Sequence, residues 1–185
     1  MRLYRRHYLS LAGINLENFK SMNRRNQVPR LPGEKPEWPH GQPSNLRADE
    51  EVDAFGYLPL EFVMLGMADA LVSKVSFDRD EAKGVVEAFA DKAAEAVRRV
   101  EAGDTVFAAF YTVVQEGDFK GDEAIRFALV GTYAEVTEAL RNVQADEEIP
   151  LHTVSLLNVT PMLKRASRLF GHLTDGKTLT EAMER

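Results

Sequence analysis

Basic side chains gather at the beginning of this chain of 185 residues. The first 47 residues hold nine Lys or Arg and three Asp or Glu, a net charge of +6, so the remainder of a chain that totals −6 carries −12. Clustered cations neutralise phosphate groups, and this asymmetry predicts a protein that docks on nucleic acid at one end only. A solvated basic terminus without a partner is the alternative that charge alone leaves open.

Side chains for catalysis or metal binding form no recognisable pattern. The chain has no cysteine, which excludes disulfides, thiolate metal sites and a cysteine nucleophile. Its four histidines are scattered, and no phosphate-binding glycine loop, GxSxG or HExxH motif occurs. Many carboxylates fall in polar runs such as 49–51 and 146–148, which are typical of solvated loops. We therefore predict no catalytic residues, no metal and no cofactor, and a protein that is not an enzyme.

Hydropathy gives an expectation about location. No apolar run approaches the roughly 20 residues that a membrane span requires. The basic residues at the start are followed by a stretch that His7, Asn15 and Glu17 interrupt, which is unlike a signal peptide. We expect a cytoplasmic protein that has no membrane partner.

Short helices and breaks organise the first part of the chain. Apolar spacing predicts helices over 5–12 and 16–25, with Gly13 between them and Asn15 as the N-cap of the second. Proline and glycine crowd positions 29–43, which predicts a loop. Pro59 is well placed in a first helical turn. A long helix is then expected from Asp78 or Asp80 to Gly103.

The pattern after Gly103 favours strands. A β-branched and aromatic run over 105–114 and an alternating run over 124–130 predict a hairpin, and 151–159 predicts a third strand. One helix is expected over 132–142. Another is expected with Thr160 as its N-cap and Pro161 in its first turn. The predicted fold class is α+β, a mostly helical winged helix-turn-helix followed by a small α/β domain of about three strands. The expected divisions are a DNA-binding domain over 1–78, a connecting helix over 79–103, and an acidic sensing or interaction domain over 104–185.

The first half of the chain resembles the MerR family. Residues 11–16 read LAGINL and are followed by Phe19, Lys20, Arg24 and the pair Val28-Pro29. This is similar to the family's "LAGVS" turn, its recognition helix that ends in an arginine, and its "LLP" exit. Residues 62–71 and 75–78 are similar to the third helix and the "GFSLEEI" entry into the fourth. The resemblance covers about residues 5–89.

The resemblance implies that the helix over 15–25 enters the major groove and that a Pro/Gly-rich wing over 29–57 touches the DNA backbone. Asn18 would then pair with adenine, Glu17 would accept from cytosine, and Lys20 would reach guanine or a phosphate. The full set of DNA-binding residues that the resemblance implies is Asn15, Glu17, Asn18, Lys20, Ser21, Arg24, Arg25, Arg30, Lys35 and Arg47.

Several positions depart from the family pattern. Glu17 stands where the family usually has arginine, Ser21 and Met22 replace a tyrosine pair, and Asn26 stands where glycine is usual. Asn tolerates that position if its backbone is left-handed. The family's long dimerising coil and cysteine-lined metal site are missing, so the resemblance implies neither metal sensing nor promoter untwisting.

These observations together favour a sequence-specific, DNA-binding transcription regulator. Its expected partners are double-stranded DNA and a second copy of itself, with RNA polymerase as a candidate protein partner of the acidic C-terminal domain, and its expected place is the nucleoid. Two alternatives stay open. One is a phage-like DNA packaging or recruitment protein that forms higher oligomers, and the other is a partner- or ligand-binding module in which the basic head is only a tether.

Overall fold

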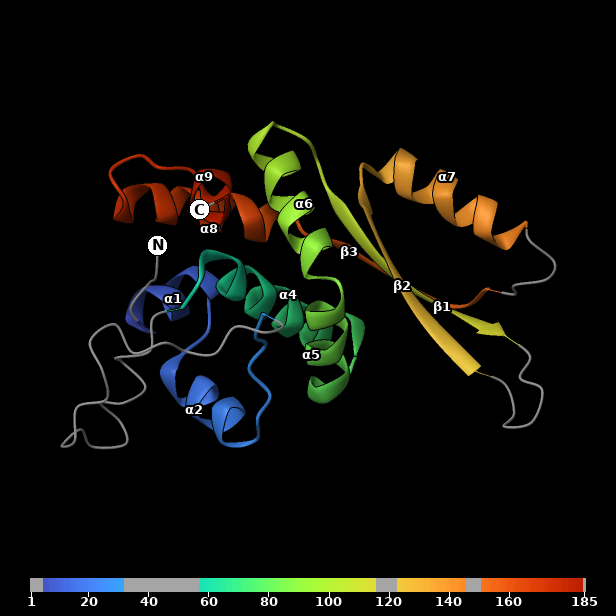
Figure 1. Ribbon diagram of the computed structural model, residues 1–185, viewed down its shortest axis with the longest axis horizontal. Coiled ribbons are helices and arrows are strands. Elements are labelled where there is room, and N and C mark those ends of the chain that lie inside the picture. The colour runs from blue at the N-terminus through green and yellow to red at the C-terminus, as the bar shows by residue number, and fades with distance from the viewer. Residues whose placement is uncertain (1–4, 32–56, 116–122, 146–150, 185) are drawn as a thin grey trace.

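The computed structural model describes residues 5–31, 57–115, 123–145 and 151–184. Figure 1 shows the helices of the N-terminal half and the two C-terminal helices at one end, and the sheet with one further helix at the other. The elements are α1 (Arg5–Ala12), α2 (Leu16–Arg24), α4 (Pro59–Val75), α5 (Arg79–Ala88), α6 (Ala90–Glu101), β1 (Phe107–Gln115), β2 (Glu123–Gly131), α7 (Tyr133–Gln144), β3 (Leu151–Asn158), α8 (Thr160–Leu173) and α9 (Leu179–Met183).

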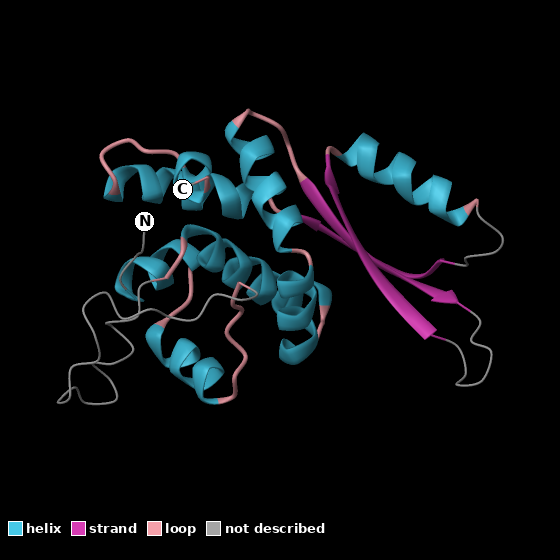
Figure 2. Cartoon of the chain, viewed as in Figure 1, coloured by secondary structure: helices cyan, strands magenta, loops and turns pink. Residues whose placement is uncertain are grey.

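The three strands form one antiparallel sheet in the order β2-β1-β3 (Figure 2). The mixed α+β class and the predicted hairpin are thereby confirmed. Alternate residues of β1 face opposite sides: Ala108 and Phe110 belong to the main core, whereas Phe107 contacts Tyr133 of α7 with ring centroids 5.4 Å apart. The sheet therefore lies between α4 and α6 on one face and α7 on the other.

The core is continuous from the N-terminal helices to the sheet. One cluster of buried apolar residues includes Tyr8 of α1, Phe62 of α4, Val97 of α6, Phe110 of β1 and Phe170 of α8. The rings of Phe62 and Phe170 stack with centroids 6.4 Å apart. The predicted boundaries at 78 and 103 thus fall between elements that share this core, and the division into domains stays a prediction.

The expected long helix between Asp78 and Gly103 is two helices. Asp78 is the N-cap of α5, its carboxylate accepting the Glu81 N–H at 2.7 Å, but the helix stops at Phe89, which has φ −118° and ψ 38°. Val85 and Val97 are both buried, so each half presents its own apolar side to the core. Apolar spacing continues through such a break, which explains why periodicity predicted a single helix.

The C-terminal end also differs from expectation. Thr160 does not cap α8 but begins it. Its hydroxyl accepts the Val106 N–H at 2.7 Å and donates to the Val106 carbonyl at 3.1 Å, which ties α8 to the start of β1. The short helix α9 was not predicted; Thr178 caps it, accepting the Glu181 N–H at 3.2 Å.

Gly13 makes the turn that sets α2 at an angle to α1. Its φ is +77°, in the left-handed region where an L side chain is strained. Asn15 follows in extended backbone, and its side-chain oxygen accepts the Asn18 N–H at 2.8 Å, which confirms the predicted N-cap. The orientation of α2 therefore depends on a glycine and a cap within three residues of each other.

Gly13→Ala should lower the free energy of unfolding by about 1–2 kcal/mol, because alanine is strained in left-handed backbone. Urea unfolding followed by circular dichroism measures this. Gly84→Ala is the matched control: Gly84 lies inside α5 with no atom within 4 Å of an added Cβ, so the same substitution should raise stability by about 0.5–1 kcal/mol. Equal effects of the two substitutions would contradict this account of the turn.

Candidate nucleic-acid interface

Helix α2 is attached to the protein through one narrow side. Phe19 and Met22 are its only buried residues, with 0% and 3% of their surfaces exposed. Phe19 meets the edges of Tyr8 and Tyr57 at centroid distances of 5.9 and 6.0 Å, and the two tyrosine rings stack 4.0 Å apart. Aromatic contacts of this kind bury much area and favour defined geometry, so three rings orient the helix.

The structure brings together the candidate residues that belong to α2 and its two caps. All lie on the outer surface of the helix, where all but the half-buried Lys20 are exposed, and Figure 1 shows α2 at the edge of the molecule, away from the sheet. A helix that packs through one side leaves the rest of its surface available to a partner. The residues brought together are Asn15, Glu17, Asn18, Lys20, Ser21, Arg24 and Arg25.

Two of these candidates contact each other. The Lys20 ammonium donates to the Glu17 carboxylate at 3.1 Å, with side chains 42% and 81% exposed. Glu17 also lies in the first turn, where the helix dipole favours an acid. An exposed pair of this kind contributes only about 0.2–1 kcal/mol, so Lys20 can exchange its carboxylate partner for a phosphate at little cost.

The C-terminal end of α2 carries two cations. Arg24 and Arg25 are exposed, and neither forms an ion pair with any residue that the structure describes. Asn26 follows with φ +56°, the left-handed backbone that the replacement of glycine by asparagine requires. The chain therefore turns away sharply after Arg25, leaving both guanidinium groups at the helix end.

Arg30 lies apart from the other candidates. Its guanidinium is 3.7 Å from the carboxylate of Glu61, a residue only 3% exposed, and 4.8 Å from the centroid of the Tyr57 ring. Its backbone N–H donates to Glu87 at 2.8 Å. The structure thus places Arg30 where it ties the segment after α2 to α4 and α5, instead of beside Arg24 and Arg25.

The tyrosines that support α2 are electrically neutral. Burial raises the pKa of Tyr8 well above its ordinary value, and the nearby Arg30 guanidinium only partly opposes this. Burial likewise raises the pKa of Tyr57. Both rings therefore act as apolar supports for Phe19 at physiological pH.

The wing candidates cannot be placed. Lys35 and Arg47 lie outside the described residues, as does 32–56 of the predicted wing at 29–57. Within that range the structure describes 29–31 and Tyr57: Tyr57 lies in the core, Leu31 packs against it, and the Arg30 guanidinium lies 4.8 Å from the centroid of the Tyr57 ring.

One cation beside the turn was not among the sequence candidates. Arg165 of α8 lies over Gly13, so close that a Cβ added to Gly13 would be 2.7 Å from its Nη1 atom. The predicted DNA-binding residues end at Arg47, because the charge asymmetry that pointed to them lies in the first 47 residues. The signal that could have found it is the spacing of Lys164, Arg165 and Arg168 on one side of a predicted helix.

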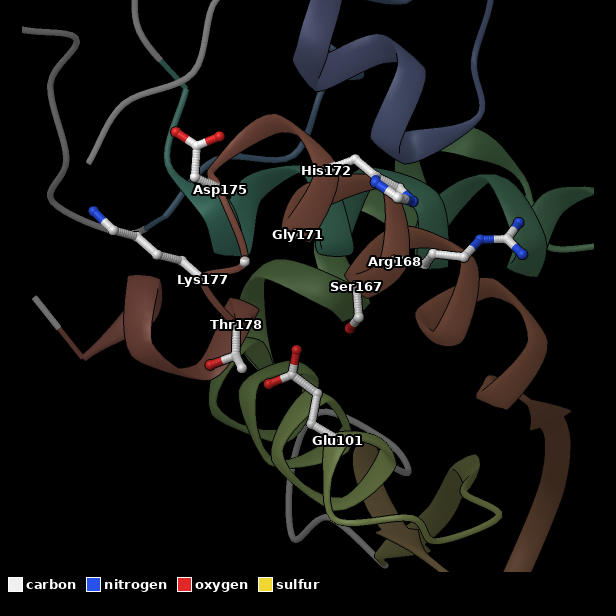
Figure 3. A pocket seen from close by; sticks show the side chains of 9 residues that line it. Glu101, Ser167, Arg168, Gly171, His172, Asp175, Lys177 and Thr178 are labelled. Carbon is white, nitrogen blue, oxygen red and sulfur yellow. The ribbon is translucent and has the colours of Figure 1, made fainter.

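A cleft of about 660 Å³ lies between α8, α9 and the end of α6. Figure 3 shows the Glu101 carboxylate and the Ser167 hydroxyl directed toward one another, while Arg168 and Lys177 point away from the centre of the cleft. The lining groups thus do not converge on one point where a ligand would bind. We interpret the cleft as the seam along which α9 joins α6 and α8.

Glu101 of α6 holds the N-terminal end of α9 in place. Its carboxylate accepts the backbone N–H groups of Leu179 and Thr180, each at 3.0 Å. Burial by itself would raise the pKa of the Glu101 carboxyl, but the hydrogen bonds from Thr180 and Leu179 outweigh it and hold the pKa below its ordinary value. The ionised form of Glu101 therefore stabilises α9, and with it the position of α8.

Comparison with known proteins gives no relative: no protein-family model, no curated protein and no solved structure matches the chain. The resemblance to the MerR family stays a prediction from the residues. Within the described ranges, no group of three or more His, Asp or Glu is placed to hold a metal ion. No helix in those ranges is long and apolar enough to cross a membrane.

Arg30→Ala should lower the free energy of unfolding by about 1–2 kcal/mol, because it leaves the buried Glu61 without its cation. Arg25→Ala, which removes an arginine that has no such partner, should change stability by less than about 0.5 kcal/mol. Urea unfolding compares the two. A larger loss for Arg25→Ala than for Arg30→Ala would contradict the roles assigned here.

Acid should weaken the hold of Glu101 on α9. A carboxyl whose pKa is lowered in the folded state stabilises the fold above its ordinary pKa of 4.5, and that contribution is lost as the pH falls through the folded value. The stability difference between wild type and Glu101→Gln should therefore narrow on acidification from about pH 6 to about pH 3. A difference that stays constant over this range would overturn the assignment.

Proposed function

We propose that this protein is a sequence-specific DNA-binding transcription regulator that places α2 in the major groove of double-stranded DNA. The observation that carries the proposal is that α2 packs through Phe19 and Met22 alone and turns the rest of its surface outward. At 1.5 Å per residue its nine residues span about 14 Å, and a major groove about 12 Å wide admits a helix of this kind.

The chemistry of the outer surface suits this partner. Asn18 pairs with adenine and Glu17 accepts from cytosine N4, the pairings that their donor and acceptor groups allow. Arg24 and Arg25, which no described carboxylate neutralises, contact phosphates and fix the register. The capped turn at Gly13 and Asn15 gives α2 a fixed direction, which base readout requires.

Three further features belong to the same proposal. The wing over 29–57, with Lys35 and Arg47, contacts the DNA backbone beside α2. The protein acts as a homodimer on two-fold operators, since protein symmetry is mirrored in the half-sites. It works at the nucleoid, where the acidic C-terminal part is available to a protein partner such as RNA polymerase.

The salt dependence of duplex binding tests the proposal. If about six side chains neutralise phosphates, the logarithm of the association constant should fall with the logarithm of salt concentration with a slope near −5. Arg25→Ala should weaken binding to all sequences and make the slope shallower by about 1. Fluorescence anisotropy with a labelled duplex measures both. A wild-type slope near zero would contradict the proposal.

Asn18→Ala distinguishes base recognition from phosphate neutralisation in the same binding experiment. It removes no cation, so the slope should stay unchanged, while discrimination at one base position falls by about 1–3 kcal/mol. A variant that discriminates between sequences as well as wild type would remove Asn18 from the readout.

A further inference from the structure

The outer face of α8 is basic in a part of the chain that is otherwise acidic. Leu163, Ala166 and Phe170 are buried on its inner face, and its 14 residues include no Asp or Glu. Lys164, Arg165 and Arg168 are exposed on the opposite face, where spacings of one and four residues place them together. We call these three residues the α8 cations.

The α8 cations are not neutralised by the described residues. Several other cations in the described ranges pair with a carboxylate, for example Arg79 with Asp69 at 3.3 Å and Arg126 with Glu81 at 2.7 Å. No ion pair with a described residue involves an α8 cation. In this they are like Arg24 and Arg25. Positive charge therefore lies beside both ends of α2, from Arg165 at the turn before it and from Arg24 and Arg25 at its C-terminal end.

One of the α8 cations, Arg165, lies next to the turn that precedes α2. Arg165 covers Gly13, two positions before the N-cap of α2. A Cβ added to Gly66 of α4 would lie 3.0 Å from Sδ of Met162 and 3.5 Å from the Ala12 carbonyl oxygen, so α8, α4 and the end of α1 meet at this point. Figure 1 shows α8, α1 and α2 at the same end of the molecule.

This position is fixed by the fold. The hydroxyl of Thr160, the first residue of α8, forms hydrogen bonds with the backbone of Val106. Phe170 stacks on Phe62, and Glu101 holds α9 beside α8. Cations on a helix that is anchored at three points lose little further freedom when they meet a partner, which favours binding.

We infer that the α8 cations are a second contact surface for the phosphate backbone of duplex DNA, continuous with the α2 surface. The inference rests on the proposed insertion of α2 into the major groove. A helix in that groove has phosphates beside its N-terminal turn, and Arg165 lies beside that turn. With a length of about 21 Å for 14 residues, α8 extends the contact along the backbone beyond the bases that α2 reads.

The surface should contribute affinity without reading sequence. Each phosphate contact adds about 0.9 to the steepness of the log–log salt dependence on duplex DNA. Lys164→Gln with Arg168→Gln leaves Arg165 on its turn and should make the slope shallower by about 2, and adding Arg165→Gln should remove about 1 more. The sequence preference, measured with duplexes that differ at single positions, should stay that of wild type.

Arg141→Glu provides a matched control. It lowers the net charge by the same two units as Lys164→Gln with Arg168→Gln, at an exposed position of α7 beyond the sheet from α2 (Figure 1). Its slope should stay within about 0.5 of wild type. An equal change for the control and for the α8 variant would mean that total charge alone acts, and would overturn the inference.

Duplex length distinguishes backbone contacts from other effects of the α8 cations. The wild-type advantage over Lys164→Gln with Arg168→Gln should be present on a duplex that extends past the α2 site and shrink on one trimmed to it. If wild type binds duplex DNA steeply and the α8 variant has the same slope, this inference fails while the proposed function stands. If wild type shows no salt-dependent binding to duplex DNA, both fail. Urea unfolding verifies that each variant is folded.

Discussion

The burial of α4 is the constraint on which the rest of this structure depends. Ten of its 17 residues are buried, and it packs against α1, α5, α6, α8, α9 and β3. A helix that is apolar on nearly every side cannot face solvent, so the other elements must surround it. Tyr57 lies two residues before α4, stacks on Tyr8 and contacts Phe19. The position of α4 therefore determines that of Phe19 and α2.

Charge is distributed over this framework in two ways. Where helices meet one another or the sheet, cations pair with carboxylates, as Arg30 does with Glu61 and Arg99 does with Asp104. At the C-terminal end of α2, where Arg24 and Arg25 lie, and on the outer face of α8 the cations lack such partners among the described residues. A helix that packs through one side only can enter a groove, and cations beside it can neutralise the phosphates of the duplex. The two features together support the proposed function more than either one alone.

Local signals predicted much of the fold because their causes are local. Asn15 and Asp78 cap helices through their own side chains, and the β-branched run of β1 pairs with its hairpin neighbour. The features that were missed depend on contacts distant in sequence. Thr160 bonds to Val106, Glu101 holds Leu179, and no local pattern announces either. Arg30 was assigned to the DNA backbone by analogy with the family, and the structure places its guanidinium 3.7 Å from Glu61, 31 positions further along the chain, with 33% of its side chain exposed.

In the candidate DNA-binding site, too, the local part could be predicted from the sequence and the long-range part could not. Spacing around Phe19 and Met22 identified the outer surface of α2, because a helix displays its own period. The proximity of Arg165 to Gly13 could not be predicted from local sequence, because about 150 residues separate the two positions and only tertiary packing brings them together. The charge of the C-terminal half is negative on average, and the average conceals the basic face of α8.

The most direct test of the central claim is selection from a random library of duplexes, performed with wild type beside Lys20→Ala and Arg24→Ala. The account predicts that wild type enriches a palindromic motif, and that both substitutions weaken the enrichment. No enrichment by wild type at low salt would mean that α2 does not read DNA, and would contradict the account.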